Sequence, residues 1–401
     1  MSKKNRKWLV FTIMCLAYMP GSYAQYQLSV FAPELMQSFG LTTSQFSSLF
    51  TAPMIVAIFL SFVGGMISDK VGSKKVINIS FVIAGIGMIG RVFANSYMPF
   101  FLCMALTGFS NMFVNINASK ITASWFEQEK LGILMGIFAF CGQLPGAFAT
   151  ATTAVLFDSR TSAFIVSAIF CISVFVLWLL FVKDKPEDTM EEREKIDQEN
   201  QPSIGDSLKV VLSNKGIWLV SICIMMALGS TVTLSTFMPM ALQTMYGIDL
   251  KVCGTIASML TLGNCIGSIT GPIVFSKIKN VKVFVSGAAV LSFAGIIMCW
   301  RFPSIFVLHI LVLYTGIMLG ASMPIFLSAP VLLEGLGTKY AGSAAGVIST
   351  LQLLGAVLIP TYILTPIAGD NYSLLFMLAS ICMVIMFLCG LLLPQFGNNQ
   401  K

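Results

Sequence analysis

The chain of 401 residues is 56% hydrophobic and only 10% charged, with a mean hydropathy of +0.86. Soluble domains contain about 25% charged residues, so these few charges do not cover the surface of a soluble globule of this size. The composition therefore excludes an ordinary soluble enzyme and predicts a chain that lipid covers. The net charge of +7 needs no nucleic-acid partner, because basic loops of a membrane protein face an anionic inner leaflet.

Twelve apolar runs follow one another along the chain, each close to the roughly 20 helical residues that cross a bilayer. They predict an all-α membrane protein with twelve transmembrane helices. A cleaved signal peptide is an alternative for the first run, because Lys3–Lys7 is basic and Ser22-Tyr23-Ala24 resembles a cleavage site. The runs are Trp8–Val30, Phe46–Ser68, Val76–Ala94, Pro99–Ala118, Leu131–Phe157, Ala163–Val182, Ile217–Leu242, Cys253–Phe275, Val283–Trp300, Ile305–Leu327, Ala341–Thr365 and Tyr372–Leu393.

The positive residues predict the orientation of these runs, because Lys and Arg are held on the cytoplasmic side. With the N-terminus inside, 20 of the 24 Lys and Arg residues fall in cytoplasmic segments. We therefore expect a multi-pass protein of the plasma membrane, or of a bacterial inner membrane, with both termini in the cytoplasm. The four exceptions are Arg91, Arg160, Lys251 and Arg301.

A charged segment separates six runs from six. Residues 184–214 hold nine of the 17 acidic residues, a composition typical of a solvated linker. The halves share residues at a drifting offset, as in Gly64 with Gly271 and Arg91 with Arg301. We predict a six-helix bundle over 1–183, a cytoplasmic linker over 184–214 and a second bundle over 215–401. Two parallel repeats of six helices are one architecture of secondary transporters, with the solute site between the halves near mid-membrane.

The loop after the second run carries a motif. Residues 65–75 read Gly-Met-Ile-Ser-Asp-Lys-Val-Gly-Ser-Lys-Lys, which resembles the conserved loop of the major facilitator superfamily; Ser73 stands where that family usually has a basic residue. The resemblance implies a cytoplasmic gate, in which an acid of the loop interacts with the N-terminal end of the eleventh helix near Ala341–Ala345. The alternative is that the basic residues act only as a topology signal, which keeps the loop on the cytoplasmic side. The expected gating residues are Gly65, Asp69, Lys70, Gly72, Lys74, Lys75 and Lys120.

A finer resemblance lies in the fourth and fifth runs. Residues 117–127, with Trp125 and Phe126, and the later Gly-Gln-Leu at 142–144 are similar to the branch of choline and haem transporters named for a feline leukaemia virus receptor. Trp125-Phe126 also resembles the oxalate/formate antiporter branch. The resemblance implies that Gln143 is a solute ligand and, through the repeat, that Gln352 is another. Lys120 is placed about 180° from Asn111 on a helix, and it is either a solute or gate residue or a loop charge.

Polar side chains recur at helical spacing within the runs, and a polar group that faces lipid is costly. Small and hydroxylated residues of this kind also pack membrane helices together. Large amides in hydrocarbon need a polar partner or water, so we expect these to face the solute. The expected solute-binding residues are Tyr18, Gln25, Asn111, Asn115, Gln143, Asn264, Tyr314 and Gln352.

The chemistry of the solute is constrained by what the runs lack. No Asp or Glu lies at mid-depth of a run, and Arg91 and Arg301 lie at outer ends, where long side chains reach the headgroups. We therefore expect a neutral, zwitterionic or weakly charged organic solute, held by amides and by rings such as that of Tyr18. A monocarboxylate or another organic anion is the alternative.

The sequence predicts a secondary transporter that works by alternating access, with the solute and the lipid bilayer as its partners. A solute sensor or receptor built on a transporter fold is the competing interpretation. We expect no enzymatic activity, no cofactor and no metal, because the ten cysteines show no paired spacing and the chain has a single His. We also expect a functional monomer.

Overall fold

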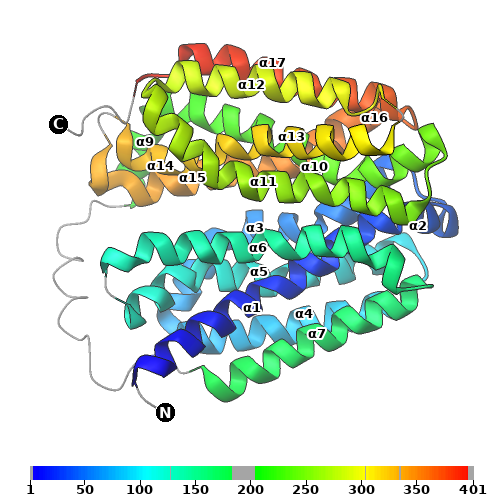
Figure 1. Cartoon of the computed structure of the whole chain (residues 1–401). Helices are drawn as coiled ribbons and strands as arrows, with labels where there is room; N and C mark the ends of the chain where they lie inside the picture. Colours follow the sequence, from blue (N-terminus) through cyan, green and yellow to red (C-terminus); the bar gives the residue numbers. More distant parts are fainter. Residues whose placement is uncertain (1–2, 127, 183–203, 303, 334–335, 396–401) are drawn as a thin grey trace. The chain divides into compact units, whose positions relative to one another are not determined.

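The computed structural model describes residues 3–126, 128–182, 204–302, 304–333 and 336–395, and the side chains of some helix residues, among them positions 65, 69 and 70, lie outside this description. Every regular element in this part of the chain is a helix (Figure 1). The helices are α1 (Lys3–Val30), α2 (Ala32–Phe39), α3 (Thr43–Val71), α4 (Ser73–Phe93), α5 (Tyr97–Trp125), α6 (Gln128–Leu156), α7 (Arg160–Phe181), α9 (Ile204–Ser213), α10 (Lys215–Tyr246), α11 (Leu250–Ile278), α12 (Val281–Met298), α13 (Ile305–Ala321), α14 (Met323–Leu332), α15 (Gly337–Leu358), η1 (Ile359–Leu364), α16 (Thr365–Ala368) and α17 (Tyr372–Leu392).

The described residues contain 11 helical segments that are long and apolar enough to cross a membrane. Helix α1 is not one of them, although its 28 residues are long enough to do so. Its second half carries Tyr18, Gln25 and Gln27, which make it more polar than the other long helices. The predicted all-α membrane fold is confirmed, with α1 as the long helix that is too polar to be recognised by hydropathy alone.

Contacts between Cα atoms divide the chain into two units. The first comprises Met1–Thr189 and Thr236–Ser258, and the second comprises Met190–Ser235 and Met259–Lys401. Within the first unit, the ring of Phe237 from the segment Thr236–Ser258 packs on that of Phe46, with centroids 5.9 Å apart. The predicted bundles and linker, at 1–183, 184–214 and 215–401, stay a prediction.

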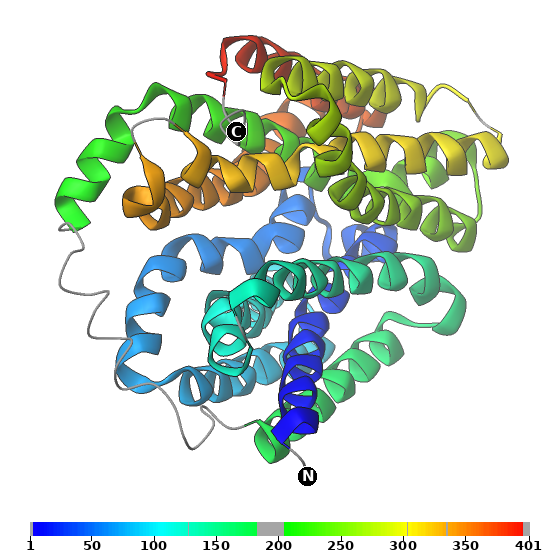
Figure 2. The same ribbon diagram turned by 60° about the vertical axis from the view of Figure 1, so that its left-hand side comes forward.

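The first unit is built around α1. This helix packs against α5, α6 and α7; it crosses the unit obliquely in Figure 1 and rises from the N-terminus in Figure 2. A buried apolar cluster fills the space between α1, α4, α5 and α7, and Trp178 and Ile77 are fully buried in it. The rings of Phe81 and Phe175 stack there with their centroids 5.4 Å apart. This packing holds the polar stripe of α1 against its neighbours.

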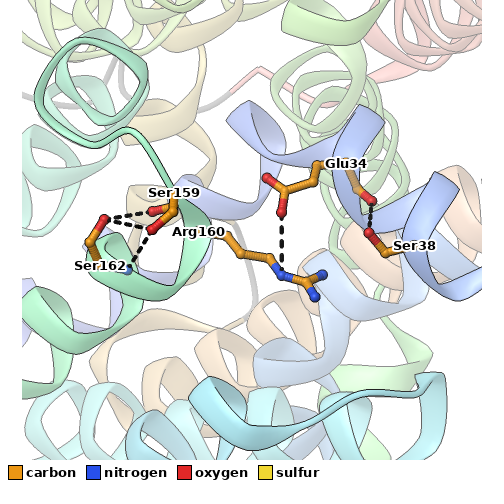
Figure 3. Close-up of polar contacts among 5 residues, drawn as sticks. All are labelled: Glu34, Ser38, Ser159, Arg160 and Ser162. Carbon is orange, nitrogen blue, oxygen red and sulfur yellow. Dashed lines mark hydrogen bonds and ion pairs between the residues drawn. The ribbon is translucent and has the colours of Figure 1, made fainter.

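A short amphipathic helix, α2, extends α1 beyond Phe31. It ends at Gly40, whose φ of +62° is a left-handed conformation that glycine adopts without strain. Its Leu35 is fully buried, while Glu34 reaches the start of α7, where Glu34 Oε1 and Arg160 Nε are 3.4 Å apart (Figure 3). The Arg160 guanidinium also lies over the ring of Phe39, 5.0 Å from its centroid. Helix α2 is thus docked on the first unit by apolar burial and by one partly exposed ion pair.

The second unit contains a close helix pair made possible by glycine. Gly263, Gly267 and Gly271 of α11 face α13, and a Cβ added at any of them would overlap the α13 backbone. Gly316 and Gly320 of α13 are in the same position relative to the α11 backbone. Small residues at four-residue spacing let membrane helices approach closely and pack by van der Waals contact. Helices α12 and α17 lie side by side on the same unit (Figure 1).

Two membrane segments of the second unit are interrupted. The tenth predicted run divides at Ser322 into α13 and α14, and Pro324 opens the second piece. The eleventh contains the π-helical turn Ile359–Leu364, with Pro360 at its start. A proline inside a helix removes a backbone donor and crowds the preceding turn, which explains both irregularities.

Candidate functional site

Tyr18 lies between α1 and α6. Its ring stacks on that of Phe138, with centroids 4.7 Å apart, and covers the backbone of Gly142. A Cβ at residue 142 would overlap Cε1 of the ring. One turn along α6, Gly146 accommodates the ring of Tyr26 in the same way, since a Cβ at residue 146 would lie 2.9 Å from Cδ2 of that ring. The two glycines of α6 therefore leave the space in which two tyrosines of α1 are seated.

Asn111 joins α5 to the same part of α1. With its amide oriented so that both groups are satisfied, the nitrogen donates to the Tyr18 carbonyl at 3.1 Å, and the oxygen accepts from Ser22 N and Ser22 Oγ at 3.1 Å each. Gly21 makes room for this amide, because a Cβ there would lie 2.5 Å from Asn111 Oδ1. The Asn111 side chain is consequently engaged in holding two helices together.

Gln143 is exposed on α6. Five of the exposed large apolar side chains of this helix, Ile137, Phe140, Leu144, Phe148 and Val155, form one stripe that suits contact with lipid, and Leu156 lies apart from it at the end of the helix. At 100° per residue, Gln143 lies about 110° from the centre of that stripe and about 60° from Phe140 at its edge. Its exposed side chain therefore lies at the edge of this apolar face, on the residue that follows the glycine covered by the Tyr18 ring.

Asn115 and Lys120 are both exposed on α5. Asn115 follows Asn111 by one helical turn and shares its face, whereas Lys120 points about 180° from Asn111. The structure thus places Tyr18 against Asn111 and against Gly142, the residue before Gln143, at the middle of α1, α5 and α6, with Asn115 one turn from Asn111. Their roles as solute ligands stay a prediction.

Two of the expected amides are used inside the protein. Gln25 is 7% exposed, and its Nε2 donates to the Phe50 carbonyl of α3 at 2.8 Å. Asn264 is 8% exposed, and its Nδ2 donates to the Leu260 carbonyl of its own helix at 3.1 Å. These bonds satisfy buried polar groups and fit packing better than solute binding.

The remaining expected ligands belong to the second unit. Tyr314 and Gln352 are half-buried on α13 and α15. The Tyr314 ring lies against α12, since a Cβ at Gly295 would be 3.2 Å from its Cδ1 and Cε1 atoms. The contacts of Tyr314 therefore join α13 to α12.

Arg91 corrects one expectation from the sequence. It does not extend toward headgroups: it is 1% exposed inside the first unit. Its Nη1 donates to the Ala24 carbonyl of α1 at 2.9 Å, and its Nη2 donates to Gln27 Oε1 at 2.9 Å and to Ser167 Oγ of α7. The repeat-related Arg301 is exposed, with its guanidinium 5.3 Å from the ring centroid of Trp300. Sequence position alone could not separate these two, because the partners of Arg91 are 64 to 76 residues away in the chain.

A second buried polar contact was also not expected. Ser68 Oγ donates to Asn117 Oδ1 at 2.8 Å, which joins α3 to α5 close to the loop that carries the motif. Asn117 Nδ2 in turn donates to the Phe113 carbonyl at 2.8 Å. A Ser and an Asn 49 residues apart give no signal of pairing in the sequence.

Comparison with known families decides the class of protein. The family model of the Major Facilitator Superfamily matches residues 10–360. The chain belongs to the major facilitator superfamily. It is a membrane transporter of this superfamily, as the sequence predicts.

Several facilitator relatives are similar over most of the chain. The probable sulfoacetate transporter SauU of Cupriavidus necator is 24% identical over 85% of this chain and 83% of its own length. The galacturonate transporter of Dickeya chrysanthemi is 22% identical over 74% and 90%. The membrane sensor protein UhpC of Salmonella typhimurium is 23% identical over 88% and 83%. The resemblance to the choline/haem and oxalate/formate branches stays a prediction.

The fold of this facilitator is shared with solved structures. That of a single-residue mutant of the nucleoside transporter NupG superposes with a TM-score of 0.77 at 15% identity and covers 96% of this chain and 99% of that one. At this identity the likeness establishes the fold and says nothing of the solute.

The facilitator loop joins α3 to α4 through a single residue. Gly72 has φ +94° and ψ 137°, a conformation that residues with a Cβ rarely adopt, and its N–H donates to the Ser68 carbonyl at 3.0 Å. Lys74 is half-buried and Lys75 is exposed at the start of α4. The side chains of Asp69 and Lys70, with position Gly65, lie outside the described residues. The gating role of this loop and of Lys120 stays a prediction.

Proposed function

We propose that this facilitator carries a small organic acid in its anionic form, by alternating access. The observation that carries the proposal is the set of uncharged donors at the middle of the first unit, Tyr18, Asn115 and Gln143, none of which is a carboxylate. Amide N–H and phenol O–H groups donate to carboxylate and sulfonate oxygens. The absence of Asp and Glu at mid-depth of the runs removes like-charge repulsion from an anion.

The relatives favour the anion over the neutral or zwitterionic solute expected from the sequence. Two of the relatives are named as transporters of sulfoacetate and of galacturonate, and both solutes are organic acids. We therefore favour the alternative stated above, a monocarboxylate or another organic anion, as the solute. Gln143 would hold the acid group, and the Tyr18 ring would form the apolar wall beside it.

The proposal is tested by ligand-induced thermal stabilisation of the purified protein. The panel contains galacturonate, sulfoacetate, galactose and choline. A ligand present at about 100 times its dissociation constant stabilises by roughly 2.7 kcal/mol, which is a readily measured shift. We expect an acid to raise the Tm of the wild type and not that of Gln143→Ala.

The control for this test is Thr152→Ala on the same helix. The Thr152 hydroxyl is bonded to its own helix, at 2.7 Å from the Phe148 carbonyl, so its loss should leave binding unchanged. Stabilisation by choline alone, or an acid shift that persists in Gln143→Ala, would contradict the proposal.

Sensing is the second candidate function. The similarity to the membrane sensor protein UhpC covers 88% of this chain, so a protein that binds the solute without moving it fits the same fold. Flux separates the two: a transporter accumulates or exchanges the solute in vesicles, and a sensor only binds it.

We also propose that the chain works as a monomer in the plasma or bacterial inner membrane, with both termini in the cytoplasm. The support for the orientation is the distribution of Lys and Arg, 20 of 24 on one side. A fluorescent protein fused at the C-terminus should be bright, and alkaline phosphatase at the same place should be inactive. The opposite pair of results would reverse the orientation.

The loop at residues 65–75 is proposed as the cytoplasmic gate of this facilitator. Its support is the match to the family motif and the fixed turn at Gly72. Asp69→Asn should slow transport while leaving solute binding intact. Unchanged transport in that variant would reduce the loop to a topology signal.

A further inference from the structure

Arg91 is a cation enclosed by three helices. From α4 it donates to the Ala24 carbonyl and to Gln27 Oε1, both on α1 and both at 2.9 Å, and to Ser167 Oγ on α7. Its Cζ lies 4.4 Å from the ring centroid of Phe164. All of these partners are uncharged.

The charge of Arg91 is not neutralised within the part of the chain that the structure describes. No described carboxylate pairs with it, and Glu34, an acid of the same unit, is engaged with Arg160. The Arg91 Nε is buried and has no hydrogen-bond partner among the described residues. A buried ion without a counter-ion is costly, and within membrane segments such residues mark functional sites.

The unpaired charge lies close to the proposed solute site along α1. Ala24 follows Tyr18 by six residues, which is about 9 Å along the helix axis and about 240° around it, so the two residues lie on different sides of α1. From the geometry we infer that Arg91 selects for anionic solutes through its electric field, without touching them. The inference rests on the proposed function and deepens it.

The size of the effect follows from Coulomb attraction. With an effective dielectric constant of about 20 and a separation of roughly 12 Å, one unit charge changes the affinity for a monoanion by roughly tenfold. A neutral solute of the same shape is unaffected to first order. The signature is therefore a change in the ratio of two affinities.

Neutralising the charge where it stands tests this inference. Gln27→Glu places a carboxylate at the atom that already accepts from Arg91 Nη2, so the pair becomes an ion pair without loss of the arginine. The measured quantity is the ratio of the dissociation constants for galactose and galacturonate. These two solutes have the same sugar ring, and only galacturonate is charged. We expect the preference for galacturonate in the wild type to fall by roughly tenfold in Gln27→Glu.

The matched control is Gln27→Met. Both variants lose the bond from Gln27 Nε2 to the Ala163 carbonyl, at 3.2 Å in the wild type, and only one adds a charge. If Arg91 had only a structural role, the ratio of the dissociation constants would change by the same amount in both variants. Glu would then support the packing of Arg91 at least as well as Met does. We expect Gln27→Met to keep the wild-type ratio.

If Gln27→Glu does not fold, Ser167→Asp neutralises the same guanidinium from α7 and should give the same loss of preference. A folded neutralising variant with the wild-type ratio would overturn the inference and leave the proposed function intact. If the wild type binds galactose and galacturonate with equal affinity, the inference is overturned. If no acid of the panel stabilises the wild type, the proposed function is overturned with it.

Discussion

At the scale of single residues, the first unit is organised by rings seated on glycines. Tyr18 and Tyr26 of α1 occupy the space that Gly142 and Gly146 leave on α6. Gly355 of the second unit follows Gly146 by 209 residues, as Gln352 follows Gln143, but its nearest neighbour is not a ring: a Cβ there would lie 2.5 Å from the Met225 carbonyl of α10. The two halves thus share a glycine and differ in what fills the space beside it.

Gly142→Ala is predicted to destabilise the protein, because its Cβ would overlap the Tyr18 ring. Overpacking of this kind costs about 1–3 kcal/mol. The measurement is Tm in detergent, together with galacturonate binding, which should weaken as the ring is displaced. Gly136→Ala on the same helix is the control, since a Cβ there meets no atom within 4 Å.

The double variant Gly142→Ala/Tyr18→Ala gives a sharper test. Removal of the ring makes space for the methyl group, so the double variant should be less destabilised than the sum of the two single changes. Strict additivity would mean that residue 142 does not support the ring.

The docking of α2 allows burial to be weighed against charge. Leu35 is fully buried, and Leu→Ala at such a site costs about 2–5 kcal/mol. The Glu34–Arg160 pair is partly exposed, at 48% and 24%, and exposed pairs contribute about 0.2–1 kcal/mol. We predict a large fall in Tm for Leu35→Ala and a small one for Glu34→Gln; the reverse order would show that the ion pair is the main anchor.

At the scale of elements, α11 and α13 depend on backbone contact. Gly316 faces the Leu260 carbonyl, and Gly320 faces that of Asn264, at distances that leave no room for a side chain. With lipid as solvent, association of helices relies on such packing rather than on the hydrophobic effect. Backbone contact therefore joins α11 and α13 within the second unit.

Gly316→Val is predicted to separate α11 from α13 and to cost at least about 3 kcal/mol, at the upper end of overpacking effects. Gly287→Val on α12 is the control, because a Cβ at Gly287 meets no atom within 4 Å. Size-exclusion profiles and Tm in detergent report the outcome. Equal behaviour of the two variants would show that the close pair is not required.

Helices could be predicted where an apolar run was long enough to cross a membrane. Runs of about 20 apolar residues admit only a helix in a membrane, so the helical fold followed from composition and length. The short helices α2 and α9 were not predicted, because neither is an apolar run of that length. The division at Ser322 and the π-helical turn at Ile359–Leu364 each carry a proline that could have signalled them.

At the scale of the whole molecule, the family and the transport class could be predicted from the loop at residues 65–75 and the two halves, and the family match confirms them. The candidate site was only partly foreseeable. Spacing identified polar faces, as for Gln143, but could not tell a free amide from one already bonded, as for Gln25. Arg91 shows the limit most clearly, since its burial depends on helices α1 and α7, distant in the chain.

The central claim is that this facilitator moves an organic acid through a site that includes Gln143. Counterflow of radiolabelled galacturonate or sulfoacetate into liposomes that carry the purified protein tests it most directly, because exchange needs no coupling ion. The account predicts saturable entry driven by unlabelled acid inside, lost in Gln143→Ala and kept in Thr152→Ala. Binding of the acid by the wild type without any entry would contradict transport and establish a sensor.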